Sequence, residues 1–451
     1  MKKFFGTDGI RGLANHHPMT PEIAMRLGQA VGLYFQSENK THRIVIGKDT
    51  RRSSYMIELA IASGVCSVGS NAMLLGPMST PGVGFVTQAM RADAGIMISA
   101  SHNPYEDNGI KIFDQQGYKL TDEMEMEIEA LMQKDLADCD RPTGEKIGKA
   151  FRVEDATGRY IEFAKKTFPQ NLTLDGLKIV VDCANGAAYK LAPQIFWELG
   201  AEVVKIGVKP NGTNINQDCG ALHPEKLTKV VQQEKADVGI ALDGDADRVI
   251  LCDENGQVAD GDQVLAICAE RLLAAGQLKN DTIVGTIMSN MGVESYLQSK
   301  GISLQRTQVG DRYILEQLRK NNLNLGGEPS GHVIFLDHTT TGDGPVVALQ
   351  VLAAMVSQKK KLSELTKNIP LYPQVSTKVR VKEKLPLEQF PELSGEIDQL
   401  NKRLKGKGRT VIRYSGTEPV LRLMIEGEDQ KIITKELKAL EAQAKKFLGA
   451  S

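Results

Sequence analysis

Three aspartates at alternate positions form the sharpest cluster of ionisable residues, in the run D-G-D-A-D-R at residues 243–248. They follow the apolar segment 238–242, whose composition predicts a buried strand. Carboxylates at i, i+2 and i+4 in a glycine-containing loop can converge on one hard cation, because without a cation their mutual repulsion is costly. We therefore predict that Asp243, Asp245 and Asp247 bind a metal ion.

The same run invites comparison with a calcium-binding EF-hand loop. Asp243, Asp245, Asp247 and Glu254 stand at its first, third, fifth and twelfth positions. Arg248, however, occupies the position that needs glycine, and the flanking segments are predicted as strands. Three aspartate ligands also leave coordination positions open for a substrate oxygen. We favour a catalytic Mg²⁺, with an acidic surface turn as the plainer alternative.

A second group is S-A-S-H-N-P at residues 99–104, at the carboxyl end of a strand predicted over residues 94–99. Ligands bind at that end of the strands in open α/β sheets. Ser101, flanked by His102, is a candidate nucleophile, although a plain loop is about as probable from these residues alone. The chain contains neither a G-x-S-x-G elbow nor a G-x-x-x-x-G-K-[ST] loop, which argues against an α/β-hydrolase and a nucleotide-driven phosphotransferase.

Two further loops combine glycine with polar side chains. In G-G-E-P-S-G-H, residues 326–332, Glu328 and Ser330 are candidates for binding vicinal sugar hydroxyls, and His332 is either a ligand or a buried core histidine. In R-Y-S-G-T-E-P, residues 413–419, the arginine together with Arg422 suits a phosphate dianion, with a solvated turn as the alternative. Arg51 and Arg52 add cations after an early strand.

The composition of the chain excludes several classes of function. The 451 residues carry a net charge of -1, with 41% hydrophobic and 25% charged residues, as expected of a globular protein without affinity for nucleic acid or membranes. Aromatic residues make up only 5%, too few for a base-stacking surface. The six cysteines show no C-x-x-C spacing, and no apolar leader segment begins the chain. We expect a cytoplasmic enzyme with reduced thiols.

The elements that must position the loops repeat along the chain. Strand and helix patterns alternate from residue 43, and the alternation starts again near residues 177 and 282. The last part differs, with strands over 375–381, 411–413 and 421–426 and helices over 385–404 and 431–448. This pattern predicts three consecutive mixed-sheet α/β domains and a smaller C-terminal α+β domain. We place the domains at residues 1–152, 153–254, 255–368 and 369–451.

Five motifs, the four above and F-G-T-D-G-I-R-G at residues 5–12, occur in the order and spacing of the α-D-phosphohexomutases. The chain resembles this family over its whole length. The resemblance implies four domains around a central active-site cleft. The opening motif and the length are most similar to the branch that interconverts glucosamine 6-phosphate and glucosamine 1-phosphate for cell-wall precursor synthesis. Glucose or mannose phosphates are the alternative substrates within the family.

The resemblance also implies a role for each site residue. Ser101 would be a phosphoserine whose phosphate shares one Mg²⁺ with the aspartates, and glucosamine 1,6-bisphosphate would be the intermediate. Lys111, ahead of His102, would be the general base, and Arg11 would also be catalytic. The residues expected to bind the phosphosugar are Thr7, Arg248, Glu328, Ser330, His332, Arg413, Ser415, Gly416, Thr417 and Arg422. A homodimer is possible. A Ca²⁺- or sugar-phosphate-sensing protein and a metal-dependent phosphatase are the rival functions.

Overall fold

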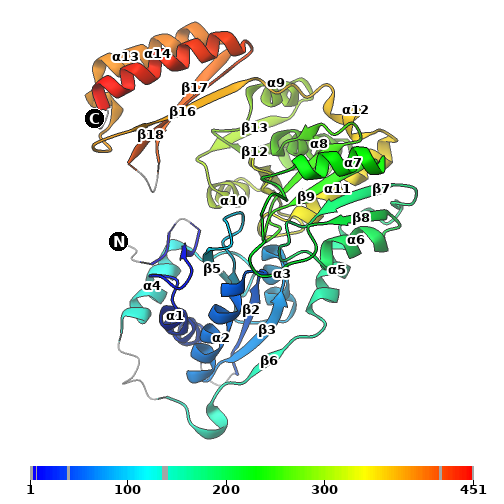
Figure 1. Cartoon of the computed structure of the whole chain (residues 1–451), viewed down its shortest axis with the longest axis vertical. Coiled ribbons are helices and arrows are strands. Elements are labelled where there is room, and N and C mark those ends of the chain that lie inside the picture. Colours follow the sequence, from blue (N-terminus) through cyan, green and yellow to red (C-terminus); the bar gives the residue numbers. More distant parts are fainter. Residues whose placement is uncertain (1–3, 7, 38–40, 135–140, 416–418, 449–451) are drawn as a thin grey trace.

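Four sheets follow one another along the chain in the computed structural model, which describes all residues except 1–3, 7, 38–40, 135–140, 416–418 and 449–451 (Figure 1). They contain six, five, four and three strands, and we call the parts built on them domains I to IV. The first three sheets combine parallel and antiparallel pairs and carry helices. The fold class expected from the sequence, three mixed-sheet α/β domains and a smaller α+β domain, is confirmed.

Domain I has the strand order β1-β5-β4-β2-β3-β6. The central strand β4 is buried along its whole length, as its apolar sequence requires. The strands of the sheet are β1 (Ile10–Leu13), β2 (Arg43–Lys48), β3 (Asn71–Pro77), β4 (Ala94–Ile98), β5 (Asp107–Asp114) and β6 (Ala150–Arg152). The helices are α1 (Pro21–Tyr34), α2 (Arg52–Ser67), α3 (Thr80–Ala89) and α4 (Asp122–Gln133).

Domain II has the strand order β11-β10-β9-β7-β8. Its central strands β7 and β9 are parallel, and β10 returns antiparallel to β9. The elements are α5 (Ala156–Lys166), β7 (Lys178–Asp182), α6 (Leu191–Glu198), β8 (Glu202–Ile206), α7 (Glu225–Glu234), β9 (Val238–Leu242), β10 (Val249–Asp253) and β11 (Val258–Ala259).

Domain III has the strand order β13-β12-β14-β15. Its strands are β12 (Thr282–Thr286), β13 (Ser303–Thr307), β14 (Leu325–Gly327) and β15 (Val333–Phe335). Its helices are α8 (Gly261–Ala274), α9 (Met291–Ser299), α10 (Asp311–Lys320), α11 (Gly344–Gln358) and α12 (Leu362–Thr366). Helix α11 is apolar on all sides because it is buried between domains rather than exposed on one face.

Domain IV is an antiparallel three-stranded sheet covered by two helices. It contains β16 (Gln374–Arg380), α13 (Pro391–Leu404), β17 (Gly408–Tyr414), β18 (Val420–Gly427) and α14 (Gln430–Leu448). The helix predicted over residues 385–404 is too long at its start. Helix α13 begins only at Pro391, after a short 3-10 turn at Leu387–Gln389, because proline favours the first helical position and lacks the N–H that a helix interior needs.

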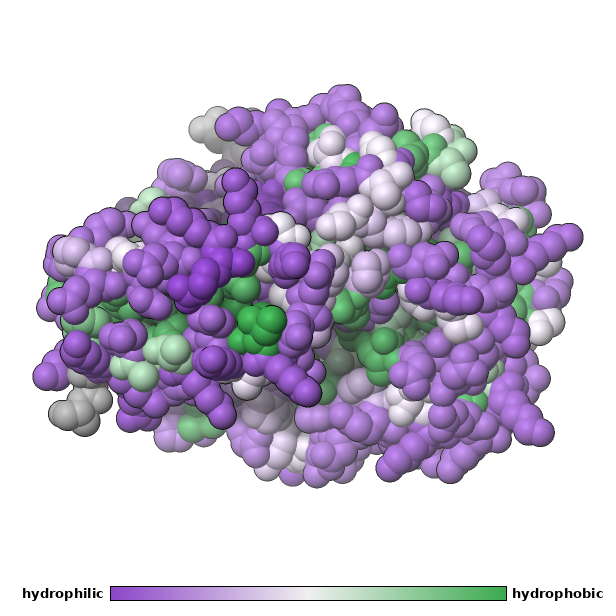
Figure 2. All heavy atoms as spheres, turned by 90° about the horizontal axis from the view of Figure 1, so that it is seen from above, coloured by the Kyte–Doolittle hydropathy of each residue, from purple (hydrophilic) through white to green (hydrophobic). Residues whose placement is uncertain are grey.

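Domain IV has an apolar core of its own, separate from the core that the other three domains share. One continuous core runs through the first three domains, from Val45 to Ile369, whereas the core of domain IV is built from residues of its own helices and sheet. Figure 1 accordingly shows domain IV set apart from the rest and adjoining it near α9 and β13. Seen from the domain IV end, the surface is mostly hydrophilic and is hollowed near its middle (Figure 2).

Two expectations about the whole chain can be compared with the structure. None of the helices in the described ranges is both long and apolar enough to cross a membrane. The five cysteines that the structure describes are free thiols, of which Cys66 is half-buried and the others are buried. Cys139 lies outside the described residues.

Candidate active site

All four predicted loops connect a strand to its antiparallel neighbour. The serine loop lies between β4 and β5, the aspartate loop between β9 and β10, the Glu328 loop between β14 and β15, and the Arg413 loop between β17 and β18. A short connection is possible because antiparallel strands can be joined by a tight turn, whereas parallel strands need a long crossover. Each of the four sheets therefore presents one of the predicted loops.

The serine loop of domain I meets the aspartate loop of domain II. The Ser101 hydroxyl donates a hydrogen bond of 2.6 Å to Asp243 Oδ2, and its oxygen lies 3.3 Å from His102 Nδ1. Ser101 is 2% exposed and has a φ of 52°, in the left-handed region that a non-glycine residue rarely adopts. Such backbone strain is characteristic of functional turns. The structure thus brings together the predicted nucleophile and the first predicted metal ligand.

Glycine is required where these two loops touch. A Cβ atom on Gly244 would lie 2.5 Å from the Ser101 carbonyl oxygen and 2.9 Å from Asn216 Nδ2. A side chain at this position would therefore push the serine loop away from the aspartates. The glycine that the motif D-G-D-A-D-R places between the first two aspartates sets their distance from Ser101.

The three aspartates converge as predicted. One side-chain oxygen from each lies within 4.8 Å of the other two, and all three residues are buried. Asp245 Oδ1 and Asp247 Oδ1 are buried without a hydrogen-bond partner among the described residues. Burial, together with the charges of Asp247 and Asp245, raises the pKa of Asp243 well above its usual value. The cluster thus offers buried hard oxygen atoms without hydrogen-bond partners, which suit Mg²⁺.

Lys111 reaches the aspartates from β5. Its Nζ lies 2.8 Å from Asp245 Oδ2, 3.4 Å from Asp247 Oδ2 and 3.6 Å from Asp8 Oδ2. Burial alone would lower the pKa of Lys111, but Asp245, Asp8 and Asp247 raise it well above its usual value. Lys111 is consequently a protonated ammonium group, which stabilises negative charge beside Ser101.

His102 has the opposite electrostatic environment. Burial and the positive charges of Arg248 and Arg11 lower its pKa to about 4. The imidazole is therefore neutral at pH 7 and able to accept a proton. Arg11 itself pairs with Asp8, and Arg248 Nε lies 3.9 Å from Asp247 Oδ1, so both guanidinium groups stand close to the aspartates and their supporting residues.

Two residues that fix the serine loop are absent from the site expected from the sequence. Arg51 is fully buried and donates to the carbonyl oxygens of Ser101, at 3.2 Å, and Asn103, at 2.6 Å. Asn216 of domain II donates to the same two oxygens at 2.9 and 3.0 Å. The sequence marks Arg51 only as a cation after β2, and no local pattern distinguishes Asn216.

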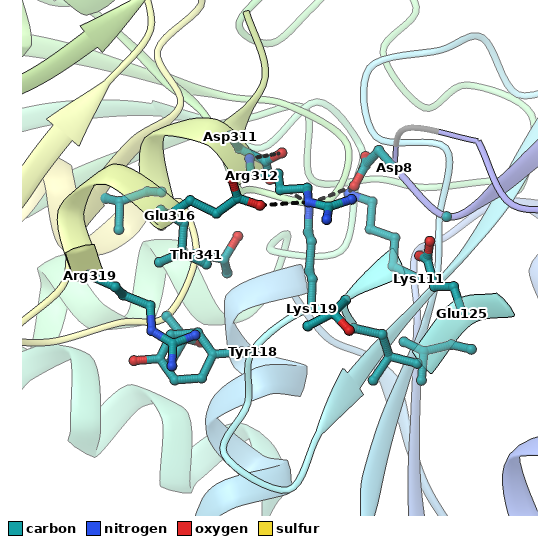
Figure 3. A pocket seen from close by; sticks show the side chains of 17 residues that line it. Asp8, Lys111, Tyr118, Lys119, Glu125, Asp311, Arg312, Glu316, Arg319 and Thr341 are labelled. Atoms are coloured by element: carbon teal, nitrogen blue, oxygen red, sulfur yellow. Dashed lines mark hydrogen bonds and ion pairs between the residues drawn. The ribbon is translucent and has the colours of Figure 1, made fainter. Parts of the chain in front are cut away.

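Domains I and III meet beside the aspartates through Lys119. Its Nζ donates at 2.6 Å both to Asp8 Oδ1 and to Asp311 Oδ2, and a cavity of about 300 Å³ lies next to this contact (Figure 3). Arg319 lies over the ring of Tyr118 on the opposite side of the cavity, 4.6 Å from the ring centroid. Lys119 and Asp311 lie in none of the five motifs, so the sequence gives no signal for them.

The predicted sugar loop lies against the same region. Glu328 Oε1 accepts the Gly310 N–H at 3.0 Å, and the Ser330 hydroxyl donates to Glu328 Oε2 at 3.3 Å. His332 is 3% exposed, accepts the Gly342 N–H at 3.1 Å and lies 3.7 Å from Asp247 Oδ1. These contacts are those of a buried histidine that supports the metal loop, and its role toward substrate stays a prediction.

The predicted phosphate site lies on the β17–β18 hairpin. Arg413 and Arg422 are directly opposed in the ladder, and burial together with the charge of Arg422 lowers the pKa of Arg413. Two adjacent guanidinium groups suit a dianion. Ser415 is buried, and its N–H bonds the Val420 carbonyl. Gly416, Thr417 and Thr7 lie outside the described residues.

Comparison with known proteins agrees with this architecture. The chain matches models of the phosphoglucomutase/phosphomannomutase alpha/beta/alpha domains I, II and III at residues 2–138, 158–256 and 260–372, and of the C-terminal domain at residues 377–443. It is 57% identical to phosphoglucosamine mutase of Geobacter sp. (strain M21), over 95% of each chain. It is 53% identical to that of Pelobacter propionicus, over 100% of this chain and 99% of the other.

The chain belongs to the phosphoglucosamine mutase family. The resemblance found from the five motifs is thereby confirmed, and the chain is an isomerase. A solved structure of a phosphoglucomutase/phosphomannomutase family protein from Burkholderia thailandensis has the same fold as this chain. The TM-score is 0.81 and the sequence identity 22%, over 98% of this chain and 97% of the other. The structure of N-acetylphosphoglucosamine mutase from Aspergillus fumigatus, solved with GlcNAc-6P and magnesium, has a TM-score of 0.69 to this chain. The sequence identity is 18%, over 98% of this chain and 96% of the other.

The close approach at Gly244 leads to a first prediction. We expect Gly244→Ala to lower the kcat for sugar-phosphate isomerisation about 100-fold, because displacement by about 1 Å misaligns reacting groups. Steady-state kinetics on the purified variant measures this change.

Gly158→Ala is the matched control. A Cβ on Gly158, in helix α5, would meet no atom within 4 Å, so this variant should keep the wild-type kcat. Full activity in Gly244→Ala would show that the serine and aspartate loops tolerate separation.

Proposed function

We propose that this protein interconverts glucosamine 6-phosphate and glucosamine 1-phosphate through a phosphorylated Ser101 and a bound 1,6-bisphosphate. The observation that carries the proposal is the hydrogen bond of 2.6 Å between the Ser101 hydroxyl and Asp243, which places a strained serine at a cluster of buried carboxylates. The identity of 57% to a phosphoglucosamine mutase supports glucosamine as the sugar. A product of this kind would supply UDP-N-acetylglucosamine synthesis for the cell wall.

The aspartate cluster would hold one Mg²⁺ together with an oxygen of the phosphoryl group on Ser101. The buried oxygens Asp245 Oδ1 and Asp247 Oδ1, which lack hydrogen-bond partners in the described part of the chain, fit this ion. When bound, Mg²⁺ offsets negative charge on the transferring phosphoryl group. An Aspergillus relative was solved with glucose 1,6-bisphosphate, which supports a bisphosphate as the intermediate.

In the forward step, the bond between Ser101 Oγ and phosphorus breaks while the free hydroxyl oxygen of the hexose monophosphate forms a bond to the same phosphorus. The proton of that hydroxyl passes to a base, and the Ser101 oxygen takes up a proton as it leaves. The bisphosphate then turns over, and its other phosphoryl group returns to Ser101 by the reverse chemistry. Glu328 and Ser330 would bind the sugar hydroxyls, while Arg413, Ser415 and Arg422, with Gly416 and Thr417, would hold the phosphate that is not reacting.

We assign the base to His102 rather than to Lys111, which the sequence favours. His102 Nδ1 lies 3.3 Å from Ser101 Oγ, at the reacting group, and burial with the charges of Arg248 and Arg11 lowers its pKa, whereas the carboxylates around Lys111 favour the protonated ammonium. Lys111 instead supplies a positive charge, together with Arg11 and Arg248, at the point where phosphoryl charge develops. Its ion pair with Asp245 keeps it there.

The phosphoserine proposal predicts a covalent modification. After incubation with glucosamine 1,6-bisphosphate, peptide mass spectrometry should find one phosphoryl group on Ser101. Ser101→Ala should lose isomerisation by more than about 1,000-fold, because no other group accepts the phosphoryl group.

Ser99→Ala controls for the neighbouring hydroxyl of the same loop, which accepts the Ser101 N–H at 2.9 Å. This variant should still be phosphorylated at Ser101. A phosphoryl group on Ser101→Ala protein would refute the assignment. Release of inorganic phosphate without isomer would show the metal-dependent phosphatase, and binding without turnover in wild type would show a sensing protein.

The two candidate bases are separated by a pair of variants at pH 7. We expect His102→Gln to lower kcat about 100-fold, as is typical when a general base is removed. Lys111→Arg preserves the positive charge but adds volume at a buried position, so it should lower kcat less than His102→Gln does. A large loss in Lys111→Arg alongside a mild one in His102→Gln would return the role of base to Lys111.

The homodimer that is possible from the sequence stays a prediction. The domain borders at residues 152, 254 and 368 likewise stay predictions.

A further inference from the structure

Domain IV joins domain III through polar contacts. The apolar core of domain IV is formed by its own residues, such as Leu421, Leu423 and Ile425 of β18, which face helices α13 and α14. The alternate residues of β18, among them Arg422 and Glu426, therefore lie on the opposite face of the sheet. The bonds made from that face decide how domain IV is oriented.

Glu426 is the central residue of this contact. It is completely buried, and its two carboxylate oxygens serve both domains. Oε1 accepts the N–H of Met291, the first residue of α9 in domain III, at 2.7 Å. Oε2 lies 2.8 Å from Nε of Arg409 in β17. The guanidinium of Arg409 then donates to the Ser289 carbonyl of domain III at 2.6 Å, which closes a ring of bonds across the domain boundary.

The chain segment that enters domain IV is fixed at the same place. The Asn290 side chain donates to the Tyr372 carbonyl at 3.0 Å and accepts the Tyr372 N–H at 2.9 Å, as a neighbouring strand would. Gly292 allows close approach, since a Cβ there would lie 2.4 Å from the Pro370 carbonyl oxygen. Residues 289–292 thus hold both the linker and the sheet of domain IV.

The same strand pair carries the candidate phosphate site. Arg409 is paired with Glu426, and Arg413 is paired with Arg422, four residues further along the ladder. Residues separated by an even number lie on the same face of a strand, and four residues span about 13 Å. A tilt of the strand pair at Glu426 therefore moves the two arginines relative to Ser101.

We propose that Glu426 is a positioning residue for substrate phosphate: its buried ion pair with Arg409 is the pivot that sets where Arg413 and Arg422 stand relative to Ser101. This inference rests on the proposed function of the two arginines. Removing the charge of Glu426 loosens the pivot, because Arg409 loses its partner, whereas the metal site in domain II is untouched.

The test is Glu426→Gln, which keeps the size of the side chain and can still accept the Met291 N–H. We expect KM for glucosamine 6-phosphate to rise about tenfold, because the loosened pivot displaces the arginines that would hold the phosphate, while kcat stays within about threefold of wild type. Calorimetric titration with Mg²⁺ should give the wild-type affinity.

Glu436→Gln is the matched control, since Glu436 forms an ion pair of 2.9 Å with Arg403 in the same domain, on the side away from domain III. Its KM should equal that of wild type. An unchanged KM in Glu426→Gln, or a loss of Mg²⁺ affinity alongside, would overturn the proposal.

If Glu426→Gln does not fold, Arg409→Lys is the second variant that tests the proposal. Lysine can pair with Glu426 but cannot also reach the Ser289 carbonyl as the planar fork does, so KM should rise about threefold. An unchanged KM in Arg409→Lys would also refute the pivot. A wild-type protein that does not isomerise glucosamine 6-phosphate would refute the proposed function instead.

Discussion

The contact between the Ser101 loop and the aspartate loop is the constraint on which the site depends. It crosses the boundary between domains I and II, and it brings an uncharged hydroxyl to within 2.6 Å of a carboxylate that two other carboxylates already repel. The arrangement persists because rigid sheets present both loops. Arg51 and Asn216 hold the serine loop by its carbonyl oxygens, and Gly244 lets the two backbones approach.

Groups of opposite charge lie side by side around this contact. The chain has almost no net charge, yet one small volume holds three buried aspartates with Lys111 and Arg248 beside them. The neighbouring aspartates hold Lys111 protonated, whereas burial and the positive charges of Arg248 and Arg11 hold His102 neutral. The sequence ranks Lys111 ahead of His102 as the base, but their surroundings give the two side chains opposite protonation states, as catalytic sites commonly require.

The sequence predicts the parts of this site that are local. The aspartate loop, the serine loop and the four-part fold follow from motif spacing and hydrophobic pattern, because short-range spacing fixes what a hairpin loop can present. Contacts such as Lys119 with Asp311, Asn216 with Ser101 and Glu426 with Met291 join residues distant in the chain. No local pattern encodes them. The proposed choice of His102 over Lys111 as base also depends on distant residues, since pKa values depend on neighbours from other domains.

The central claim is that the three aspartates of the β9–β10 loop form one cation site where domain II meets the serine loop of domain I, and calorimetric titration with Mg²⁺ tests it most directly. Wild type should bind one ion per chain, and Asp245→Asn should bind at least about tenfold more weakly. Asp253→Asn, which alters a buried aspartate in β10 outside the cluster, should bind as wild type does. Equal affinity in Asp245→Asn and wild type, or no Mg²⁺ binding by wild type, would contradict the account.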